Sequence, residues 1–259
     1  MKAFKSYLIP ILFGVIFSRI IQFLFFPINV GKFSFDFGHI SILSLVISST
    51  LLLLGIKHIF LWISLGSSFD QLIYLIIKDN STQTFFSAYS IFGSLIFIML
   101  SVLLFLFIYK DIDQNDRNIP IDFFYKKNRI IIHCITTFLV ILVFRISQIL
   151  LIKAGIPNEN RSFMILGYEI HHINHGLILI YITSNILYFF NFKRYNILIL
   201  ILLSIGIALI NDQITYYALK NVSDEAYLGF ESLIGAIGVS ICQILILIIY
   251  TDVQKNNFS

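Results

Sequence analysis

Residues 196–220 read NILILILLSIGIALINDQITYYALK, and this stretch decides the fold. Its first fifteen residues carry no charged side chain. An apolar run of roughly 20 residues is long enough to cross a bilayer as a helix. The polar trio Asn211-Asp212-Gln213 then interrupts the run. Because an ionisable residue within a membrane helix is costly, Asp212 is expected to face other helices rather than lipid.

The rest of the chain has the same character. Of its 259 residues, 58% are hydrophobic and 12% are charged, and the mean hydropathy is +0.89. A soluble domain is about half apolar and a quarter charged, so a soluble enzyme is excluded. Apolar runs between charged or turn-rich breaks predict an all-α, polytopic integral membrane protein. The eight predicted spans are 7–29, 38–56, 58–77, 86–109, 130–153, 164–190, 195–219 and 226–250.

The two halves of the chain resemble each other. FDQLIYLIIK (69–78) matches NDQITYYALK (211–220), and FSRIIQFLFF (17–26) matches VFRISQILLI (143–152). Chance similarity between two Ile-, Leu- and Phe-rich segments is the alternative, but the polar matches keep the same order. Two shorter matches follow that order: FDFGHIS (35–41) with YEIHHIN (168–174), and SIFGS (90–94) with SLIGA (232–236).

This duplication predicts the domain organisation. Residues 1–109 form a first four-helix repeat, 110–129 a charged linker, and 130–259 a second four-helix repeat. Because an even number of spans leaves both repeats in the same orientation, a pseudo-two-fold axis along the membrane normal is expected.

The distribution of basic residues predicts the orientation. Eleven Lys and Arg lie on one side of the predicted spans and five on the other, while Arg19 and Arg145 lie within spans. The side richer in basic residues faces the cytoplasm, so both termini and the linker are expected there, in a cell membrane. The net charge of +4 therefore indicates membrane orientation and not a nucleic-acid partner. The eleven are Lys2, Lys5, Lys57, Lys110, Arg117, Lys126, Lys127, Arg129, Lys193, Arg194 and Lys255.

The matched polar residues are expected to lie in one layer near the non-cytoplasmic surface. YEIHHINHG (168–176) is the richest stretch. On a helix, Glu169, His172 and His175 would share an arc of roughly 120°. Glu-x-x-His is also the spacing used by dimetal helical bundles. We therefore hypothesise a mono- or dinuclear site for Zn, Fe or Mn, since carboxylate and imidazole ligands suit these metals. The expected metal ligands are His172, His175, Asp212, Glu169, Asp36, His39 and Asp70.

Two alternatives to this shared metal site stay open. The second repeat alone could hold a mononuclear site, because Gly38 and Ile42 replace His171 and His175 in the first repeat. The same side chains could instead form an ion-pair network that only holds helices together, as polar groups in membrane helices commonly do. Its members would be Arg145, Glu169, Asp212 and Glu231.

The polar layer suggests a metal-dependent membrane enzyme that acts on a lipid or another outer-leaflet substrate. Glu169 or Glu231 would be the general acid or base. Arg145 would stabilise an anionic group and, with Arg19 and Tyr216, bind the substrate. A proton- or ion-coupled carrier and a non-catalytic assembly protein are the alternatives, the carrier because titratable groups and parallel repeats occur in transporters. His133, near the start of the fifth span, is interpreted as interfacial.

Overall fold

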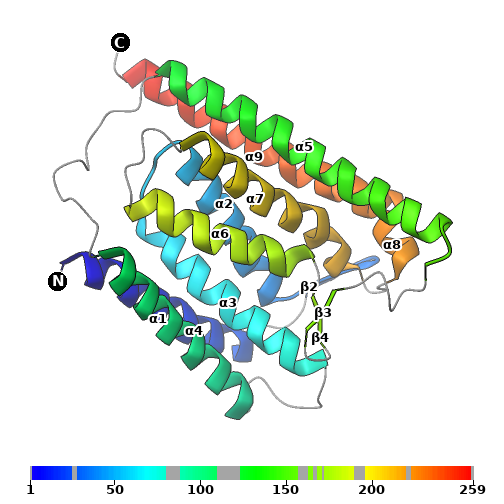
Figure 1. Ribbon diagram of the computed structural model, residues 1–259, viewed down its shortest axis with the longest axis horizontal. Coiled ribbons are helices and arrows are strands. Elements are labelled where there is room, and N and C mark those ends of the chain that lie inside the picture. Colours follow the sequence, from blue (N-terminus) through cyan, green and yellow to red (C-terminus); the bar gives the residue numbers. More distant parts are fainter. Residues whose placement is uncertain are drawn as a thin grey trace. The chain divides into compact units, whose positions relative to one another are not determined.

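The computed structural model describes residues 2–24, 28–79, 88–109, 123–156, 163–165, 168–170, 172–189, 196–219 and 223–257. Helices dominate this described part, which confirms the predicted helical class (Figure 1). Each of the eight predicted apolar runs overlaps one long helix. The helices are α1 (Lys2–Leu24), α2 (Phe37–Leu53), α3 (Ile59–Asp79), α4 (Ala88–Tyr109), α5 (Phe123–Lys153), α6 (His172–Phe189), α7 (Asn196–Ala218), α8 (Asp224–Leu228) and α9 (Phe230–Asn257).

Three of these helices are long and apolar enough to cross a membrane. The candidate spans are Lys127–Lys153 in α5, Ile197–Ala218 in α7 and Phe230–Val253 in α9. They support a membrane protein. The crossing of all eight long helices stays a prediction. Shorter apolar helices are Ser6–Gln22, Phe37–Leu53, Ile59–Ile73 and Ile91–Leu103.

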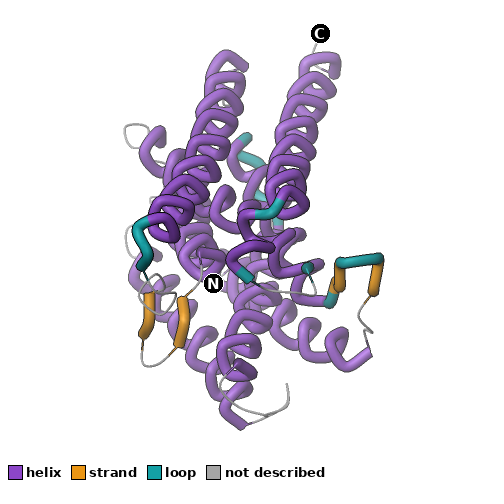
Figure 2. Tube along the Cα trace, turned by 90° about the vertical axis from the view of Figure 1, so that its right-hand side faces the viewer, coloured by secondary structure: helices purple, strands orange, loops and turns teal. Residues whose placement is uncertain are grey.

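Two short β-hairpins were not expected from the sequence. β1 (Ile28–Val30) pairs antiparallel with β2 (Phe33–Phe35), and β3 (Phe163–Ile165) pairs antiparallel with β4 (Tyr168–Ile170). Figure 2 shows both hairpins in orange beside the helices. The prediction that the first span includes 28–29, and the sixth span 164–165 and 168–170, is therefore wrong. β-branched and aromatic residues favour extended backbone there, and Gly31 takes a positive φ of 57° in the first turn.

The chain divides into two compact units. Unit 1 comprises Met1–Ser48, Lys57–Arg117 and Tyr188–Asn191, and unit 2 comprises Ser49–Ile56, Asn118–Leu187 and Phe192–Ser259. Within unit 1, α3 packs against α1 and α4, which also touch each other. Within unit 2, α7 packs in the same way against α5 and α9. Most of α7 is buried, whereas most of α5 and α9 exposes large apolar side chains.

Two glycines allow α1 and α3 to approach closely. A Cβ on Gly14 would lie 2.1 Å from the Ile63 carbonyl oxygen, and one on Gly66 would lie 2.3 Å from the Ile11 carbonyl oxygen. These two positions bring α1 and α3 into backbone contact in unit 1. Small residues of this kind are enriched where membrane helices pack.

Candidate functional site

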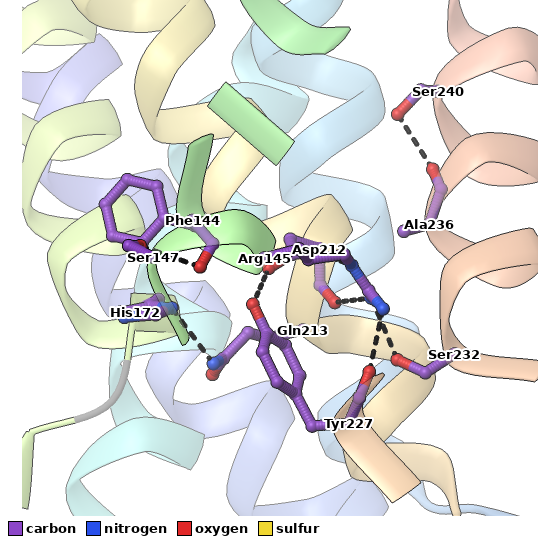
Figure 3. A network of polar contacts seen from close by, with 10 residues as sticks. All are labelled: Phe144, Arg145, Ser147, His172, Asp212, Gln213, Tyr227, Ser232, Ala236 and Ser240. Atoms are coloured by element: carbon purple, nitrogen blue, oxygen red, sulfur yellow. Dashed lines mark hydrogen bonds and ion pairs between the residues drawn. The ribbon is translucent and has the colours of Figure 1, made fainter. Parts of the chain in front are cut away.

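Arg145 on α5 is the centre of a buried polar cluster in unit 2 (Figure 3). Its Nε donates to Asp212 Oδ1 on α7 at 2.7 Å. Its Nη1 donates to the Tyr227 carbonyl oxygen at 2.7 Å, and its Nη2 donates to Ser232 Oγ at 3.0 Å. The guanidinium group therefore connects α5, α7, α8 and α9 through three different nitrogen atoms.

Tyr227 on α8 completes this cluster. Its hydroxyl donates to Asp212 Oδ2, and its ring lies 4.8 Å from the Arg145 guanidinium carbon. Burial and the neighbouring Asp212 carboxylate raise the pKa of the Tyr227 hydroxyl, which therefore stays protonated and remains a donor. Both carboxylate oxygens of Asp212 thus accept a hydrogen bond from the protein.

Unit 1 contains a similar cluster around Arg19 on α1. Arg19 donates to Asp70 Oδ1 through Nε at 2.9 Å and through Nη2 at 2.7 Å. The same Nη2 donates to Ser94 Oγ at 2.7 Å, and Ser94 donates to Asp70 Oδ1 at 2.6 Å. The sequence match pairs Ser232 with Ser90, but Ser94, one helical turn later, is the serine that contacts Arg19.

A glutamine follows each clustered aspartate and binds a different partner in each unit. Gln71 Nε2 donates to Ser18 Oγ at 2.8 Å. Gln213 Nε2 lies 3.3 Å from His172 Nδ1 (Figure 3). The His172 ring also packs edge-on against Phe144, with centroids 4.4 Å apart.

Of the other predicted residues of unit 2, Tyr216 contacts this cluster, and Glu231 and His175 are exposed. Tyr216 is buried, and its ring packs edge-on against the ring of Tyr227, with centroids 5.5 Å apart. Glu231 is exposed in the first turn of α9, where a carboxylate stabilises the helix N-terminus. His175 is exposed one turn after His172.

The predicted helical arc of Glu169, His172 and His175 is wrong. Glu169 lies in strand β4, opposite Met164, and α6 begins only at His172. The i, i+3 geometry of a metal-binding helix therefore does not apply to Glu169, whose side chain lies outside the described part, as does His171.

Asp36 and His39 contact each other and close the first turn of α2. The His39 backbone N–H donates to Asp36 Oδ1 at 3.1 Å, and the His39 ring nitrogen Nδ1 lies 2.7 Å from the same oxygen. Asp36 therefore caps the first turn of α2, and the His39 ring pairs with the capping carboxylate. This arrangement gives the two residues a structural role that needs no metal.

Within the residues that the structure describes, no three His, Cys, Asp or Glu side chains form a group that could hold a metal ion. Asp70 and Asp212 each form an ion pair with a guanidinium group, that of Arg19 and that of Arg145 respectively. A cation would have to compete with these ion pairs. A metal bound through the Glu169 side chain stays a prediction.

Sequence reasoning missed Tyr227 and α8. Its prediction merged residues 226–229 into the eighth span, whereas the chain forms the separate turn Asp224–Leu228. Ser223 accepts a hydrogen bond from the Ala226 N–H at 3.1 Å and so caps this turn. The sequence Ser223-Asp224-Glu225 is a typical helix start, and this signal could have revealed the break.

Comparison with known proteins identifies no relative of this chain. No family model, curated protein or solved structure matches the chain.

Proposed function

We propose that this chain is a multi-pass membrane protein built from two repeated four-helix units, and that its buried arginine–aspartate clusters hold each unit's helices in register. In this proposal the clusters have a non-catalytic, assembling role. All eight long helices cross the membrane, with both termini and residues 110–129 in the cytoplasm. The lipid bilayer is the partner.

The clusters support this proposal because the same residue types connect matching helices. Arg19 and Arg145 lie on the first helix of each repeat, and Asp70 and Asp212 on the third. A serine on the last helix completes each cluster. Buried polar contacts between membrane helices are a recognised means of association.

Packing contacts away from the clusters follow the same repeat. A Cβ on Gly93 would lie 2.6 Å from Ile73, three residues after Asp70. A Cβ on Gly235 would lie 2.1 Å from Thr215, three residues after Asp212. The last helix of each repeat therefore meets its third helix at the same matched position, which supports a duplication.

The ends of the second helices add another parallel. Arg129 Nη1 donates to the Leu53 carbonyl oxygen at the end of α2, at 3.0 Å. Lys57 Nζ donates to the Tyr188 carbonyl oxygen near the end of α6, at 2.7 Å. A basic side chain on the last carbonyl groups of a helix stabilises that helix end.

The observation that carries the assembling role is that every side-chain nitrogen of Arg145 is engaged by the protein. All three of its side-chain nitrogens donate to oxygens of the protein, and both carboxylate oxygens of Asp212 accept from the protein. A guanidinium group that recognises a substrate would need donors directed at that substrate. The arrangement of Arg145 is that of a clamp between helices.

A stability cycle tests the clamp. Arg145→Met alone leaves the Asp212 carboxylate buried without its ion partner, and we expect it to lower the free energy of unfolding by about 3–5 kcal/mol. Arg145→Met combined with Asp212→Leu removes both charges and should recover most of this loss. Chemical unfolding of the full-length protein in detergent micelles measures both variants.

Unit 1 supplies an independent repetition of this test. Arg19→Met and its combination with Asp70→Leu should show the same pattern, a large single loss and a recovery in the double variant. If Arg145→Met unfolds with wild-type stability, or if the double variant is no more stable than the single one, the clamp is wrong.

A further inference from the structure

The hairpin β1–β2 lies between α1 and α2 in unit 1 and has one apolar face (Figure 2). Side chains alternate between the two faces of a strand, and cross-strand partners share a face. The register therefore places two pairs on the same face, Ile28 with Phe35 and Val30 with Phe33. The rings of Phe33 and Phe35 stack there, with centroids 6.0 Å apart.

The opposite face of this hairpin is polar. By register it carries the remaining cross-strand pair, Asn29 with Ser34. The turn between the two strands consists of Gly31 and Lys32, and Lys32 is exposed. A separation of apolar residues from polar and basic ones is also the pattern of helices that lie in the plane of a membrane surface.

Most of the apolar face is exposed. Ile28 is 53% exposed, Val30 60% and Phe35 38%. Among the described elements, β1 and β2 pack mainly against each other. Because a two-stranded hairpin is at best marginally stable in water, a partner that covers this face would stabilise the hairpin.

The place of the hairpin in the chain favours the bilayer surface as this partner. In the proposed topology α1 crosses outward and α2 crosses back, so β1–β2 lies at the non-cytoplasmic surface, beside the lipid headgroups. The ammonium group of Lys32 complements the lipid phosphates, and lysine side chains commonly extend toward a membrane interface.

The backbone of the hairpin limits its depth. Within the described residues this sheet has two strands, so each strand has an outer edge whose N–H and C=O groups pair with no further strand. Hydrocarbon offers no hydrogen-bond partner to such an edge, and open sheet edges do not occur inside it. Water and phosphate in the headgroup layer do supply partners, which favours a shallow position.

Unit 2 has a hairpin with the same pattern between its first and second long helices. β3–β4 precedes α6 as β1–β2 precedes α2. Glu169 and Met164 are cross-strand partners and share one face by register. The four residues that share the other face are all apolar or aromatic: Phe163, Ile165, Tyr168 and Ile170. The pattern recurs although the residues differ, which supports a common role for the two hairpins.

We propose that the β1–β2 hairpin lies flat in the phospholipid headgroup layer on the non-cytoplasmic side of the membrane. Ile28, Val30 and Phe35 face the acyl chains, and Asn29 faces water. The hairpin thereby fixes the outer ends of α1 and α2 at the interface. This inference rests on the proposed membrane placement of the chain and is independent of the clamp.

Spin labels on single cysteines test this placement. Cysteine replaces Ile28, Asn29 or Val30 in the full-length chain with Cys134→Ser and Cys242→Ala, reconstituted in dioleoylphosphatidylcholine vesicles. Each label is exposed to oxygen, which concentrates among acyl chains, and to a nickel complex, which stays in water. We expect the ratio of oxygen to nickel collisions to be several-fold higher at 28 and 30 than at 29.

Leu139, exposed on α5 within its candidate span, supplies the lipid-facing reference. If a label at 139 meets oxygen while 28 and 30 behave like 29, the hairpin does not enter the membrane and only this inference fails. If the label at 139 also meets mainly nickel, the membrane placement fails, and the inference fails with it. Protection of 28 and 30 from both reagents would show that protein covers this face, which would also overturn the proposal.

Two variants place the same charge on opposite faces of the hairpin. Val30→Asp puts a carboxylate on the apolar face, where entry into the acyl chains is costly. It should lower the oxygen-to-nickel ratio of a label at position 28 several-fold. Asn29→Asp puts the carboxylate on the polar face and is the matched control, which should leave this ratio unchanged. Equal ratios in the two variants would contradict the proposed orientation.

Discussion

Asp36 shows how a charged residue that precedes an apolar helix can stabilise the first turn of that helix. Its carboxylate caps α2, and the His39 ring nitrogen Nδ1 lies 2.7 Å from that carboxylate. Burial alone raises the pKa of Asp36, but the hydrogen bonds and charge of His39 together outweigh burial and lower this pKa below 3.8. The folded state therefore favours the carboxylate form.

This pKa shift predicts a pH-dependent loss of stability. A carboxyl group with a lowered folded pKa stabilises the protein above its unfolded pKa, and this contribution disappears as pH falls through the folded pKa. Asp36→Asn keeps a good capping side chain but removes the charge. The melting temperature of the wild type should exceed that of Asp36→Asn near neutral pH, and the difference should shrink below about pH 4. If the difference in melting temperature between the wild type and Asp36→Asn stays constant from pH 7 to pH 3, the predicted contribution of the Asp36 charge is wrong.

Residue types could be predicted at several positions, but their partners could not. The match of Arg19 with Arg145 and of Asp70 with Asp212 anticipated opposite charges at one depth, and the structure pairs them. The sequence predicts His133 near the membrane interface but does not predict its burial, with Nδ1 3.0 Å from Ser204 Oγ. When the sequence matches are continued toward the helix starts, Tyr7 corresponds to His133 and Trp62 corresponds to Ser204. In unit 1 these two aromatic rings pack edge-on. Apolar periodicity locates helices but does not show which side chain of a neighbouring helix a polar group meets.

At the level of elements, the contact of α1 with α3 depends on two glycines. Gly14 and Gly66 each face a backbone carbonyl group of the opposite helix. A carbonyl oxygen of a helix backbone has no rotamer that moves it away. The contact therefore tolerates no added side-chain atom unless the helices separate.

The pair Gly66→Ala and Gly238→Ala tests this close approach. Alanine favours helix over glycine by up to about 1 kcal/mol, so Gly238→Ala, with nothing within 4 Å of its new Cβ, should be neutral or stabilising. Gly66→Ala should instead lower the free energy of unfolding by about 1–3 kcal/mol through overpacking. Unfolding in detergent compares the two variants, and equal effects would show that α1 and α3 do not need this contact.

Element boundaries were less predictable than the elements. A continuous apolar run does not distinguish a helix from a short strand, so the sequence predicts one span over 164–190 although β3 and β4 precede α6. That error produced the helical arc of Glu169, His172 and His175. The charge of segment 110–129 predicts a linker, yet α5 begins at Phe123, since Lys and Arg are good helix formers.

At the level of the whole molecule, the proposed eight spans predict which loops lie on each side of the membrane. Single cysteines at Gln114→Cys and Asn160→Cys, in a chain with Cys134→Ser and Cys242→Ala, should lie on opposite sides. A membrane-impermeant maleimide added to intact cells should label position 160 but not position 114. After permeabilisation both positions should react, which controls for access.

Either of two results would contradict this topology. Labelling of position 114 alone in intact cells would reverse the orientation derived from the basic residues. Labelling of both positions would place them on the same side and remove one crossing between them.

Each unit is made of chain segments that are far apart in the sequence, and this has a consequence for biosynthesis. Unit 2 includes Ser49–Ile56, which the ribosome makes early, and unit 1 includes Tyr188–Asn191, which it makes late. Unit 1 therefore stays incomplete until most of the polypeptide has been translated, and Lys57 must wait for the Tyr188 carbonyl group. In a nascent chain halted in the linker, Lys57 would still lack this partner, so the contact forms only after α6 has been synthesised.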